Sequence, residues 1–579
     1  MSTYILGLQP ASTHFSSHDP SACLIKDGKI VAFAEEERFV RIKHAKGIFP
    51  LHAIRYCLQH AGIGLADVDK IALPADPAFC AVSPEKLLRF EKTHLAGNLV
   101  RTVHSLRMMK VKGFKQAPAI EKEIKEEVKG LLKPLTAVKD DVFVFVQHHL
   151  AHAASAYYCS PFKKASVLTI DGVGEIGQGE CSVLWTGDGK DLVKNKAYLY
   201  PNSLGHYYSL VCNHLGFEWM EGPGKVMGLA PYGAASSDFT SIFERNTKAT
   251  KPYDVTKMMS RLQVRALLGK ARKAGEELTE RHKNIAFMLQ LRLEEMALSL
   301  AEENRDITGS ENLCLAGGVA MNCVMNGRLL RSSFVKDIFV QPGATDLGLS
   351  IGAAIMANKE LGNDPFVEFS HVYLGPSFTN EEIKQAFAEA GLKQGMHYDQ
   401  VGDITGTTAD LMAKNRLIAW FQGRMEGGPR ALGGRSIVAN PRDKAMKDII
   451  NAKVKHRELW RPFCPSLLER ANEEYIEDAY PSPYMILAFN VKKEKQAEIP
   501  SVVHVDGSAR TQTVTKETNA PYFKLISEFE KLTGTPVIMN TSLNDRGEPI
   551  VCSPKDAVKT FLNTGLEYLA IGDFLVKKV

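Results

Sequence analysis

The sequence lacks three features that would assign its class directly. Its ten cysteines include no CxxC pair, so neither a zinc ribbon nor a thioredoxin-type redox site is indicated. It has no apolar run of about 18 residues or more, so no membrane-spanning helix is expected. The N-terminal stretch has no basic region followed by a long apolar segment, so we do not expect a signal peptide.

The sequence also has little excess of charge of one sign. Lys and Arg total 71 and Asp and Glu total 66, which leaves a net charge of +5 on 579 residues. So small an excess does not indicate a protein that coats nucleic acid, but it is compatible with a local basic pocket. Scattered cysteines in apolar runs are typical of free thiols in a reducing compartment. We therefore expect a cytoplasmic protein that engages neither membrane nor nucleic acid.

What is present is the composition of a folded protein with several cores. Hydrophobic residues make up 45% and charged residues 24%, which is ordinary for globular proteins. At about 150 residues per domain, the length predicts at least two domains. Gly, Pro, Asn and acidic residues gather at 358–380. We place the boundary there, with one domain at 1–365 and a second at 366–579.

A strand-and-turn pattern occurs twice in the first domain. Predicted strands at 22–25 and 30–34 flank Asp27-Gly28, a strong signal for a two-residue hairpin turn. The same order of strand, glycine loop, strand and Asp-Gly turn returns at 167–189. This recurrence predicts a duplicated α/β unit.

Further elements follow from periodicity and turn residues. Helices are predicted at 51–61, 84–111, 119–140 and 284–304. In the second domain, an α/β or α+β unit, strands are predicted at 416–421, 484–490, 501–505 and 536–539.

The sharpest chemical signal is HHLAH at 148–152. On a helix, His148 and His152 project from one face, which suits two imidazoles on one metal ion. Asp171 ends a predicted strand, and Asp346 precedes a helix of small residues. Two histidines and two carboxylates would suit iron, manganese or zinc. The alternative is a capped helix whose histidines pack in the core.

Three glycine-rich segments could bring backbone amides close to a nucleotide. They are DGVG from Asp171, GPGKVMG around Lys225 and AGGVAMN at 316–322. Lys225 lacks the Walker A frame, and each segment alone can be a tight turn. Together in one duplicated domain, they predict an actin-like (ASKHA) architecture.

A basic set occupies the second domain. The segment GRMEGGPRALGGRS at 423–436 is followed by Lys453, Lys455, Arg457 and Arg461, and later by segments at 504–510 and 540–544. Arginine forks match phosphate geometry, so the set predicts a site for small polyphosphates or acyl phosphates. The alternatives are a solvated charged face and an RNA surface. The interleaved Pro, Gly and aromatic residues weigh against the first, and the few stacking positions weigh against the second.

Eight segments together resemble the NodU/CmcH-type O-carbamoyltransferase family, which includes the tobramycin carbamoyltransferase. They are HDPSACLIKDGKIVAFAEEERFVRIKH, HHLAHAASAYYCSPF, LTIDGVGE, GKVMGLAPYG, LAGGVAMNC, GRMEGGPRALGGRSI and HVDGSARTQTV with MNTSLNDRGEPIV. The resemblance covers nearly the whole chain. It departs at Gly427, where the family often has an aromatic or aliphatic residue, and at Gly434, where it often has Asn.

The resemblance implies two modules and two steps. The C-terminal module would be YrdC-like and would convert carbamoyl phosphate and ATP to carbamoyl-adenylate, phosphate and pyrophosphate. The N-terminal module would be actin-like and would transfer the carbamoyl group to an acceptor hydroxyl, releasing AMP. The implied acceptor is a small natural product or sugar of secondary metabolism, and the implied assembly is a homodimer. The alternatives are an N-carbamoyltransferase or a tRNA enzyme of the threonylcarbamoyladenosine type and, further off, an actin-like ATPase chaperone or sensor.

The resemblance also implies residue roles. The residues that would grip carbamoyl phosphate and the ATP phosphates are Arg430, Lys455, Arg461 and Arg510. Those that would bind the carbamoyl group, the phosphate or the nucleotide are Asn540, Ser542, Gly317, Gly318, Asn322 and Lys225. The metal, Fe(II) first with Mn or Zn as alternatives, would be held by His148, His152, Asp171 and Asp346, and Mg would accompany ATP. His18 would be the general base on the acceptor hydroxyl, or else a turn histidine.

Overall fold

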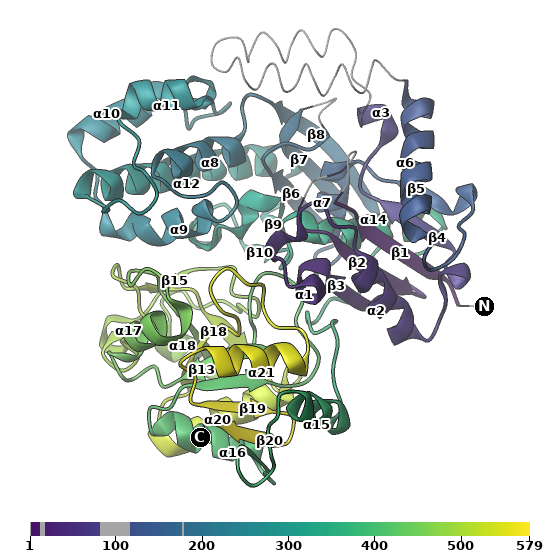
Figure 1. The fold of residues 1–579 in the computed structure, drawn as a ribbon. Coiled ribbons are helices and arrows are strands. Elements are labelled where there is room, and N and C mark those ends of the chain that lie inside the picture. The colour runs from purple at the N-terminus through teal and green to yellow at the C-terminus, as the bar shows by residue number, and fades with distance from the viewer. Residues whose placement is uncertain (1, 12–14, 16–17, 81–115, 176–178, 579) are drawn as a thin grey trace. The chain divides into compact units, whose positions relative to one another are not determined.

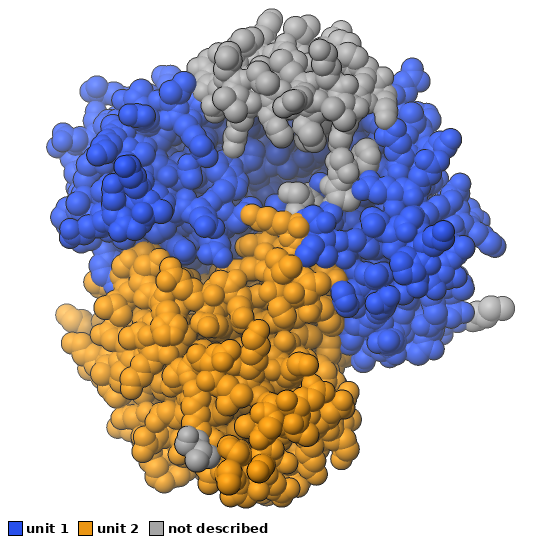
Figure 2. Space-filling view, in the orientation of Figure 1, with its two compact units in different colours: residues 1–32, 47–369 blue, residues 33–46, 370–579 orange. Residues whose placement is uncertain are grey.

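The computed structural model describes residues 2–11, 15, 18–80, 116–175 and 179–578 (Figure 1). These residues form two compact mixed α/β units (Figure 2). Unit 1 comprises 1–32 and 47–369, and unit 2 comprises 33–46 and 370–579. The helix predicted at 84–111 lies outside the described residues. In the described part, no helix combines the length and the apolar character needed to cross a membrane.

The first sheet of unit 1 has the strand order β3-β2-β1-β4-β5. Its strands are β1 (Tyr4–Gln9), β2 (Ser21–Lys26), β3 (Lys29–Glu35), β4 (Lys70–Leu73) and β5 (Phe143–Phe145). The central strand β1 pairs antiparallel with β2 and parallel with β4. The sheet is thus an antiparallel meander extended by two parallel strands.

The second sheet of unit 1 repeats this arrangement in the order β8-β7-β6-β9-β10. Its strands are β6 (Lys164–Ile170), β7 (Glu180–Asp188), β8 (Asp191–Leu199), β9 (Asn312–Ala316) and β10 (Asp337–Val340). Here β6 pairs antiparallel with β7 and parallel with β9. The repeated order confirms the predicted duplication of an α/β unit.

Two helices of unit 1 lie at or near their predicted bounds: α2 (Leu51–Ala61), predicted at 51–61, and α12 (Glu280–Thr308), predicted at 284–304. The other helices of unit 1 are α3 (Pro77–Cys80), α6 (Ala117–Leu132), α7 (His148–Tyr157), α8 (Leu204–His214), α9 (Gly222–Leu229), α10 (Ser237–Asn246), α11 (Arg261–Leu268), α13 (Cys323–Leu330) and α14 (Leu349–Glu360). The helix predicted at 119–140 ends earlier, at Leu132, where Lys133-Pro134 follows. Pro134 has no N–H with which to continue the helical hydrogen bonds, so the helix ends there.

Unit 2 is built on an eight-stranded sheet in the order β11-β20-β19-β12-β13-β18-β14-β17. These strands are β11 (Tyr398–Gln400), β12 (Ile418–Phe421), β13 (Arg435–Ala439), β14 (Cys464–Leu468), β17 (Gln512–Val514), β18 (Val537–Ser542), β19 (Tyr568–Ile571) and β20 (Phe574–Lys577). A separate pair is β15 (Phe489–Asn490) and β16 (Ser508–Ala509). The helices are α1 (Glu36–Val40), α15 (Asn380–Glu389), α16 (Ile404–Ala413), α17 (Met446–Ile450), α18 (Asn472–Tyr475), α19 (Lys493–Gln496), α20 (Ala520–Thr533) and α21 (Pro554–Asn563).

Two strand predictions in unit 2 are wrong. Only the last two residues of 484–490 are in a strand, and 501–505 forms turns. Prolines precede both segments, at Pro483 and Pro500, and proline removes a ladder donor. The apolar side chains of 485–488 and of Val502 are buried without regular strand pairing, whereas Val505 is exposed.

The structure divides the chain differently from a single cut near 365, because residues 33–46 belong to unit 2. The N–H of Phe33 donates to the carbonyl of Leu374 at 3.2 Å, and Arg38 donates to the carbonyl of Gly428 at 2.6 Å. Arg41 donates to the carbonyls of Pro549 and Ile550. Long-range bonds of this kind are invisible in local periodicity.

Candidate functional site

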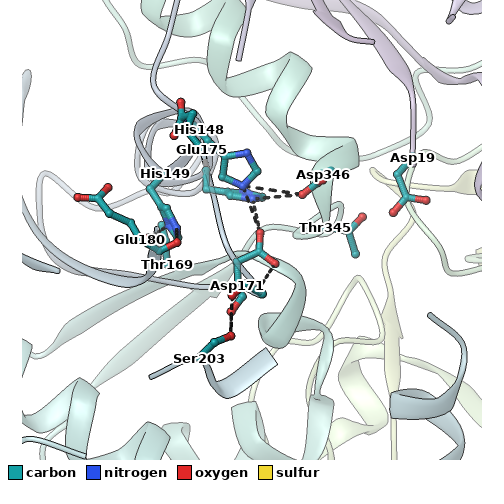
Figure 3. A network of polar contacts seen from close by, with 12 residues as sticks. Asp19, His148, His149, Thr169, Asp171, Glu175, Glu180, Ser203, Thr345 and Asp346 are labelled. Atoms are coloured by element: carbon teal, nitrogen blue, oxygen red, sulfur yellow. Dashed lines mark hydrogen bonds and ion pairs between the residues drawn. The ribbon is translucent and has the colours of Figure 1, made fainter. Parts of the chain in front are cut away.

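The four residues predicted as metal ligands converge in unit 1 (Figure 3). His148 and His152 lie one turn apart on α7, Asp171 follows β6, and Asp346 begins the short turn before α14. Their ligand atoms all lie within 4.8 Å of one another. Asp171 Oδ2 is 3.3 Å from His148 Nε2 and 3.1 Å from His152 Nε2, and Asp346 Oδ1 is 3.6 Å from His152 Nε2.

Close helix packing brings Asp346 to the histidines. Helix α14 is rich in small residues and packs directly on α7. A Cβ at Gly352 would lie 1.8 Å from the carbonyl oxygen of Ala151, so only glycine allows this approach. The small-residue helix noted in the sequence is therefore what sets the width of the cluster.

Charge in this cluster is balanced. Burial lowers the pKa of His152, but its contacts with Asp171 and Asp346 outweigh burial and raise the pKa to about 9. Burial alone would raise the pKa of Asp171, yet bonds from His148 and His152 hold it well below its usual value. Each cation in the cluster thus has a carboxylate within reach.

The middle histidine of the run has a different role. His149 Nδ1 lies 2.9 Å from Thr169 Oγ1, and its Nε2 lies 3.0 Å from the carbonyl oxygen of Glu180. Burial, followed by the charges of His148 and His152, lowers its pKa to about 3. His149 is therefore a neutral packing residue, which is the alternative that the sequence left open for the whole run.

Sequence reasoning missed the groups that hold α7 in place. Glu175 Oε1 accepts the N–H of His148 at 2.7 Å, at the start of the helix. Gln147 donates to Glu180 at 2.7 Å, and Lys194 donates to the same carboxylate at 2.9 Å. The signal for Glu175 was present, since it ends the quoted segment LTIDGVGE.

The structure also brings His18 to this cluster. Its Nε2 lies 3.9 Å from Asp346 Oδ2, and its Nδ1 lies 3.3 Å from Asp19 Oδ2. Burial lowers the pKa of His18, but the bond to Asp19 and the nearby carboxylates outweigh this and raise it to about 9. His18 is thus a partly exposed group beside the four converging residues.

The predicted nucleotide-binding residues of unit 1 separate into two groups. Gly317 (φ +89°) and Gly318 lie against the end of β6, and a Cβ at Gly318 would be 3.2 Å from Asp171 Oδ1. Asn322 instead caps α13 and exchanges hydrogen bonds with Gln290 at 2.9 and 3.1 Å. Lys225 lies on α9, 3.6 Å from Glu221, and the described residues show no polar contact between it and the histidine–carboxylate cluster.

In unit 2, the directions of neighbouring strands bring the predicted anion-binding residues to one edge of the sheet, where strands begin or end. Strand β14 pairs antiparallel with β18, so the start of one and the end of the other share this edge. Strand β17 runs parallel to β14, and Arg510 precedes it. Ser542 ends β18.

Lys455 ends a π-helical turn (Asn451–Lys455) and is buried. Its ammonium donates to the carbonyl of Ser542 at 2.5 Å, the carbonyl of Asn544 at 3.0 Å and Asn544 Oδ1 at 2.7 Å. Burial, then the charges of Arg457 and Arg461, lower the pKa of Lys455 well below its usual value. π-helical turns are frequent at functional sites.

We call Lys455, Arg457, Arg461 and Arg510 the cationic cluster. Arg457 stacks on Phe463 at 4.6 Å, and burial followed by Arg461 lowers its pKa to about 9. Arg510 donates to Cys464 Sγ at 3.2 and 3.1 Å. Arg461 Nη1 is 3.8 Å from Glu458. The sequence places Arg457 in this basic set but does not predict a binding role for it.

The loop that carries half-buried Arg430 is tightly folded around Glu426. Glu426 Oε1 accepts the N–H groups of Leu432, Gly434 and Arg435 at 2.7, 3.1 and 3.1 Å. A Cβ at Gly434 would lie 2.6 Å from Glu426 Oε2. A Cβ at Gly427 would lie 2.5 Å from the Phe33 ring. Both departures from the family pattern are therefore required by this chain's own packing.

The last predicted residue of unit 2, Asn540, is buried and connects a loop to the sheet. Its Nδ2 donates to the carbonyl of Ala431 at 3.1 Å and to Ser466 Oγ at 3.0 Å. Ser542 Oγ donates to Asn544 Oδ1 at 2.6 Å. The amide of Asn540 therefore ties the Arg430 loop to the sheet.

Sequence comparison assigns the family. Residues 5–355 match the family described as Carbamoyltransferase N-terminus, and residues 409–578 match Carbamoyltransferase C-terminus. The chain therefore belongs to the carbamoyltransferase family of enzymes, as the sequence motifs predicted.

Individual relatives show which members of this family the chain resembles. The chain is similar to nodulation protein NolNO of Sinorhizobium fredii, with 38% identity over 97% of this chain and 79% of that protein. It is also similar to nodulation protein U of Rhizobium tropici, with 28% identity over 92% of this chain and 90% of that protein. The predicted resemblance to NodU-type proteins is thus confirmed.

Likeness to solved structures is weak. Full-length HypF in the phosphate- and nucleotide-bound form gives a TM-score of 0.36 at 15% identity, covering 63% of this chain and 47% of that one. The activator of the 2-hydroxyisocaproyl-CoA dehydratase from Clostridium difficile gives 0.33 at 13% identity, covering 62% and 96%. Scores this low carry no argument, so the duplicated unit stands on the repeated sheet order.

Proposed function

We propose that this protein is an ATP-dependent O-carbamoyltransferase. Unit 2 would be the YrdC-like module that forms carbamoyl-adenylate, and unit 1 the actin-like module that transfers the carbamoyl group to an acceptor hydroxyl. The acceptor would be a small natural product or sugar. The observation that carries the proposal is the cationic cluster of unit 2, in which burial and neighbouring cations lower the pKa values of Lys455 and Arg457.

An excess of buried cations favours a bound polyanion. Arg457 and Lys455 have lowered pKa values because burial and like charges disfavour their charged forms. The phosphates of carbamoyl phosphate and ATP would supply the missing negative charge, and arginine forks match their geometry. We therefore assign Arg430 and the cationic cluster to these phosphates, and Ser542 to a hydrogen bond with the carbamoyl group.

The adenylate step balances with one water. Water takes the phosphoryl group of carbamoyl phosphate, which leaves carbamate and phosphate. A carbamate oxygen then attacks the α-phosphorus of ATP and expels pyrophosphate, giving carbamoyl-adenylate. Fixed cations that face the developing negative charge would lower this barrier without reorganising.

The converging residues of unit 1 fit a divalent metal. Two ligand atoms, each about 2.1 Å from one ion, are about 3.0 to 3.4 Å apart at octahedral or tetrahedral angles. The contacts of His148 and His152 with Asp171 lie in this range. An Fe(II) ion bound there, or Mn or Zn, would supply Lewis-acid polarisation of the carbonyl or the phosphate.

Transfer then needs a base and a leaving group. The acceptor oxygen forms a bond to the carbamoyl carbon, the bond to AMP breaks, and the hydroxyl proton must leave. His18, beside Asp346 and partly exposed, would take that proton in its neutral form. Gly317 and Gly318 would let the nucleotide approach the end of β6.

Pyrophosphate release tests the proposal. Release from ATP is measured with and without carbamoyl phosphate in wild type, Arg461→Ala and His148→Ala. Arg416→Ala, which removes an exposed arginine paired with Glu567 at 3.0 Å, is the control. We expect release only with carbamoyl phosphate, lost in Arg461→Ala and kept in His148→Ala and the control. ATP hydrolysis to ADP without carbamoyl phosphate would refute the proposal.

A further inference from the structure

We propose that residues 33–46 act as a positioning segment for Arg430 and for the cationic cluster of unit 2. Glu35 and Arg38 would fix the turn before Arg430, and Arg41 would fix the loop after Asn544. The inference rests on the anion-binding role proposed for this cluster. It gives a function to the EEERFVRIKH part of the first motif, which no step above uses.

The first contact binds both backbone polar groups of one residue, Gly428. Arg38 is fully buried, and its Nε donates to Glu35 Oε2 at 2.7 Å. Its Nη2 donates to the carbonyl of Gly428 at 2.6 Å, while the N–H of Gly428 donates to Glu35 Oε1. Gly428 has φ +96° and stands two residues before Arg430. The pair thus fixes the backbone from which Arg430 extends.

Stability alone does not explain this pair. Removing two charges from water is costly, and apolar residues of similar size often serve stability equally well. The pair instead satisfies both backbone groups of a residue in a left-handed conformation. The pair therefore holds the backbone geometry of the loop that carries Arg430.

The second contact reaches Lys455 through three steps. Arg41 donates through Nη1 to the carbonyl of Ile550 at 2.6 Å and through Nη2 to the carbonyl of Pro549 at 2.8 Å. The preceding carbonyl, of Glu548, accepts from Asn544 Nδ2 at 2.7 Å. Asn544 Oδ1 in turn accepts from Lys455. Arg41 is therefore a positioning residue for the buried ammonium.

The backbone of the segment supports a specific role. Arg41, His44 and Ala45 all have positive φ, at 58°, 62° and 37°. Non-glycine residues rarely adopt this region, and such strain gathers at functional sites. The charge of Lys43 also contributes to the lowered pKa of Lys455, after burial and the two arginines.

The test replaces the fork of Arg41 while keeping its charge. In full-length Arg41→Lys, one ammonium cannot bridge two consecutive carbonyls as a guanidinium does. We expect the KM for carbamoyl phosphate in pyrophosphate release to rise about five- to tenfold, the effect of about one lost hydrogen bond. The kcat and the melting temperature should match those of the control Arg416→Lys. An unchanged KM, or a kcat loss that parallels a melting-temperature loss, would overturn the inference.

A second readout separates this inference from the proposed function. Calorimetry measures binding of inorganic phosphate to wild type, Arg41→Lys and Arg38→Lys without turnover. Weaker phosphate binding in Arg41→Lys, by about five- to tenfold, supports positioning even if wild type releases no pyrophosphate and the proposed function fails. Equal phosphate affinity in wild type and Arg41→Lys contradicts it. Because Arg38 is fully buried, its variant is read only if it melts as wild type does.

Discussion

The two clusters of polar residues treat charge in opposite ways. In unit 1, histidines stand beside carboxylates, so the pKa of His152 is raised and that of Asp171 is lowered. In unit 2, burial and then the neighbouring cations lower the pKa values of Lys455 and Arg457. The first cluster sets histidines beside carboxylates, whereas the second sets buried Lys455 beside two arginines.

The difference indicates what each cluster can hold. Deprotonated histidine and aspartate ligands suit a cation, which replaces the protons that the first cluster otherwise keeps. Neighbouring buried cations suit an anion, which supplies the opposite charge. The two clusters therefore match the metal site and the phosphate site that we propose.

The largest expected effects separate the two clusters by partial reaction. Lys455→Met should lower carbamoyl-phosphate-dependent pyrophosphate release by about 100- to 1,000-fold, because a fixed cation is lost. Asp171→Asn should spare that release and lower carbamoyl transfer by a similar factor. Pyrophosphate and AMP are measured in parallel, with Arg416→Ala as control. Equal loss of both products in both variants would break the comparison.

The next largest effect that should distinguish the two clusters is on metal content. His152→Gln should lower the affinity for a divalent ion by at least about 10- to 100-fold, since it removes one of four ligand candidates. His149→Gln is the matched control, because His149 contacts Thr169 Oγ1 and the backbone carbonyl oxygen of Glu180 rather than the carboxylates of the cluster. Elemental analysis after dialysis measures bound metal. Equal metal content in wild type and His152→Gln would contradict the metal assignment.

Packing at Gly427 gives a smaller effect, confined to unit 2. Gly427→Ala places a Cβ 2.5 Å from the Phe33 ring, and overpacking of this kind costs about 1–3 kcal/mol. Gly402→Ala is the control, because nothing lies within 4 Å of its added Cβ. Denaturant unfolding followed by fluorescence measures the difference. A Gly427→Ala variant as stable as Gly402→Ala would show that the loop and Phe33 separate freely.

The smallest expected effect is on pH dependence. An anion would raise the lowered pKa of Lys455, so binding should take up a proton when pH exceeds the pKa of the free state. Phosphate affinity should then fall by up to about tenfold per pH unit in that range. Calorimetry in buffers of different ionisation enthalpy measures the uptake. Wild type should show proton uptake that Lys455→Met lacks, and equal uptake in both would refute this coupling.

Local patterns predicted much of unit 1. The spacing of His148 and His152, and the positions of Asp171 and Asp346 beside regular elements, were sufficient to predict the cluster that the structure shows. The duplication was readable because each copy repeats a strand order with short turns. These features depend on residues close in sequence.

The parts that could not be predicted depend on distant residues. Glu35-Glu36-Glu37-Arg38 reads as a charged surface helix, yet Arg38 is fully buried against Gly428, 390 residues away. The run at 484–490 looks like a strand because it is apolar, yet most of it is buried without a pairing partner. The role of Asn322 was also hidden, because its amide pairs with Gln290 on another helix.

The discontinuity of unit 2 has a consequence for biosynthesis. Arg38 and Gly428 are separated by 390 residues, and ribosomes add about 5–20 residues per second. Arg38 therefore leaves the ribosome roughly 20–80 seconds before its partner is made. During that interval residues 33–46 lack the rest of unit 2, because residues 47–369 of unit 1 are synthesised first. One of the first stretches of this chain to be synthesised is among the last to reach its final surroundings.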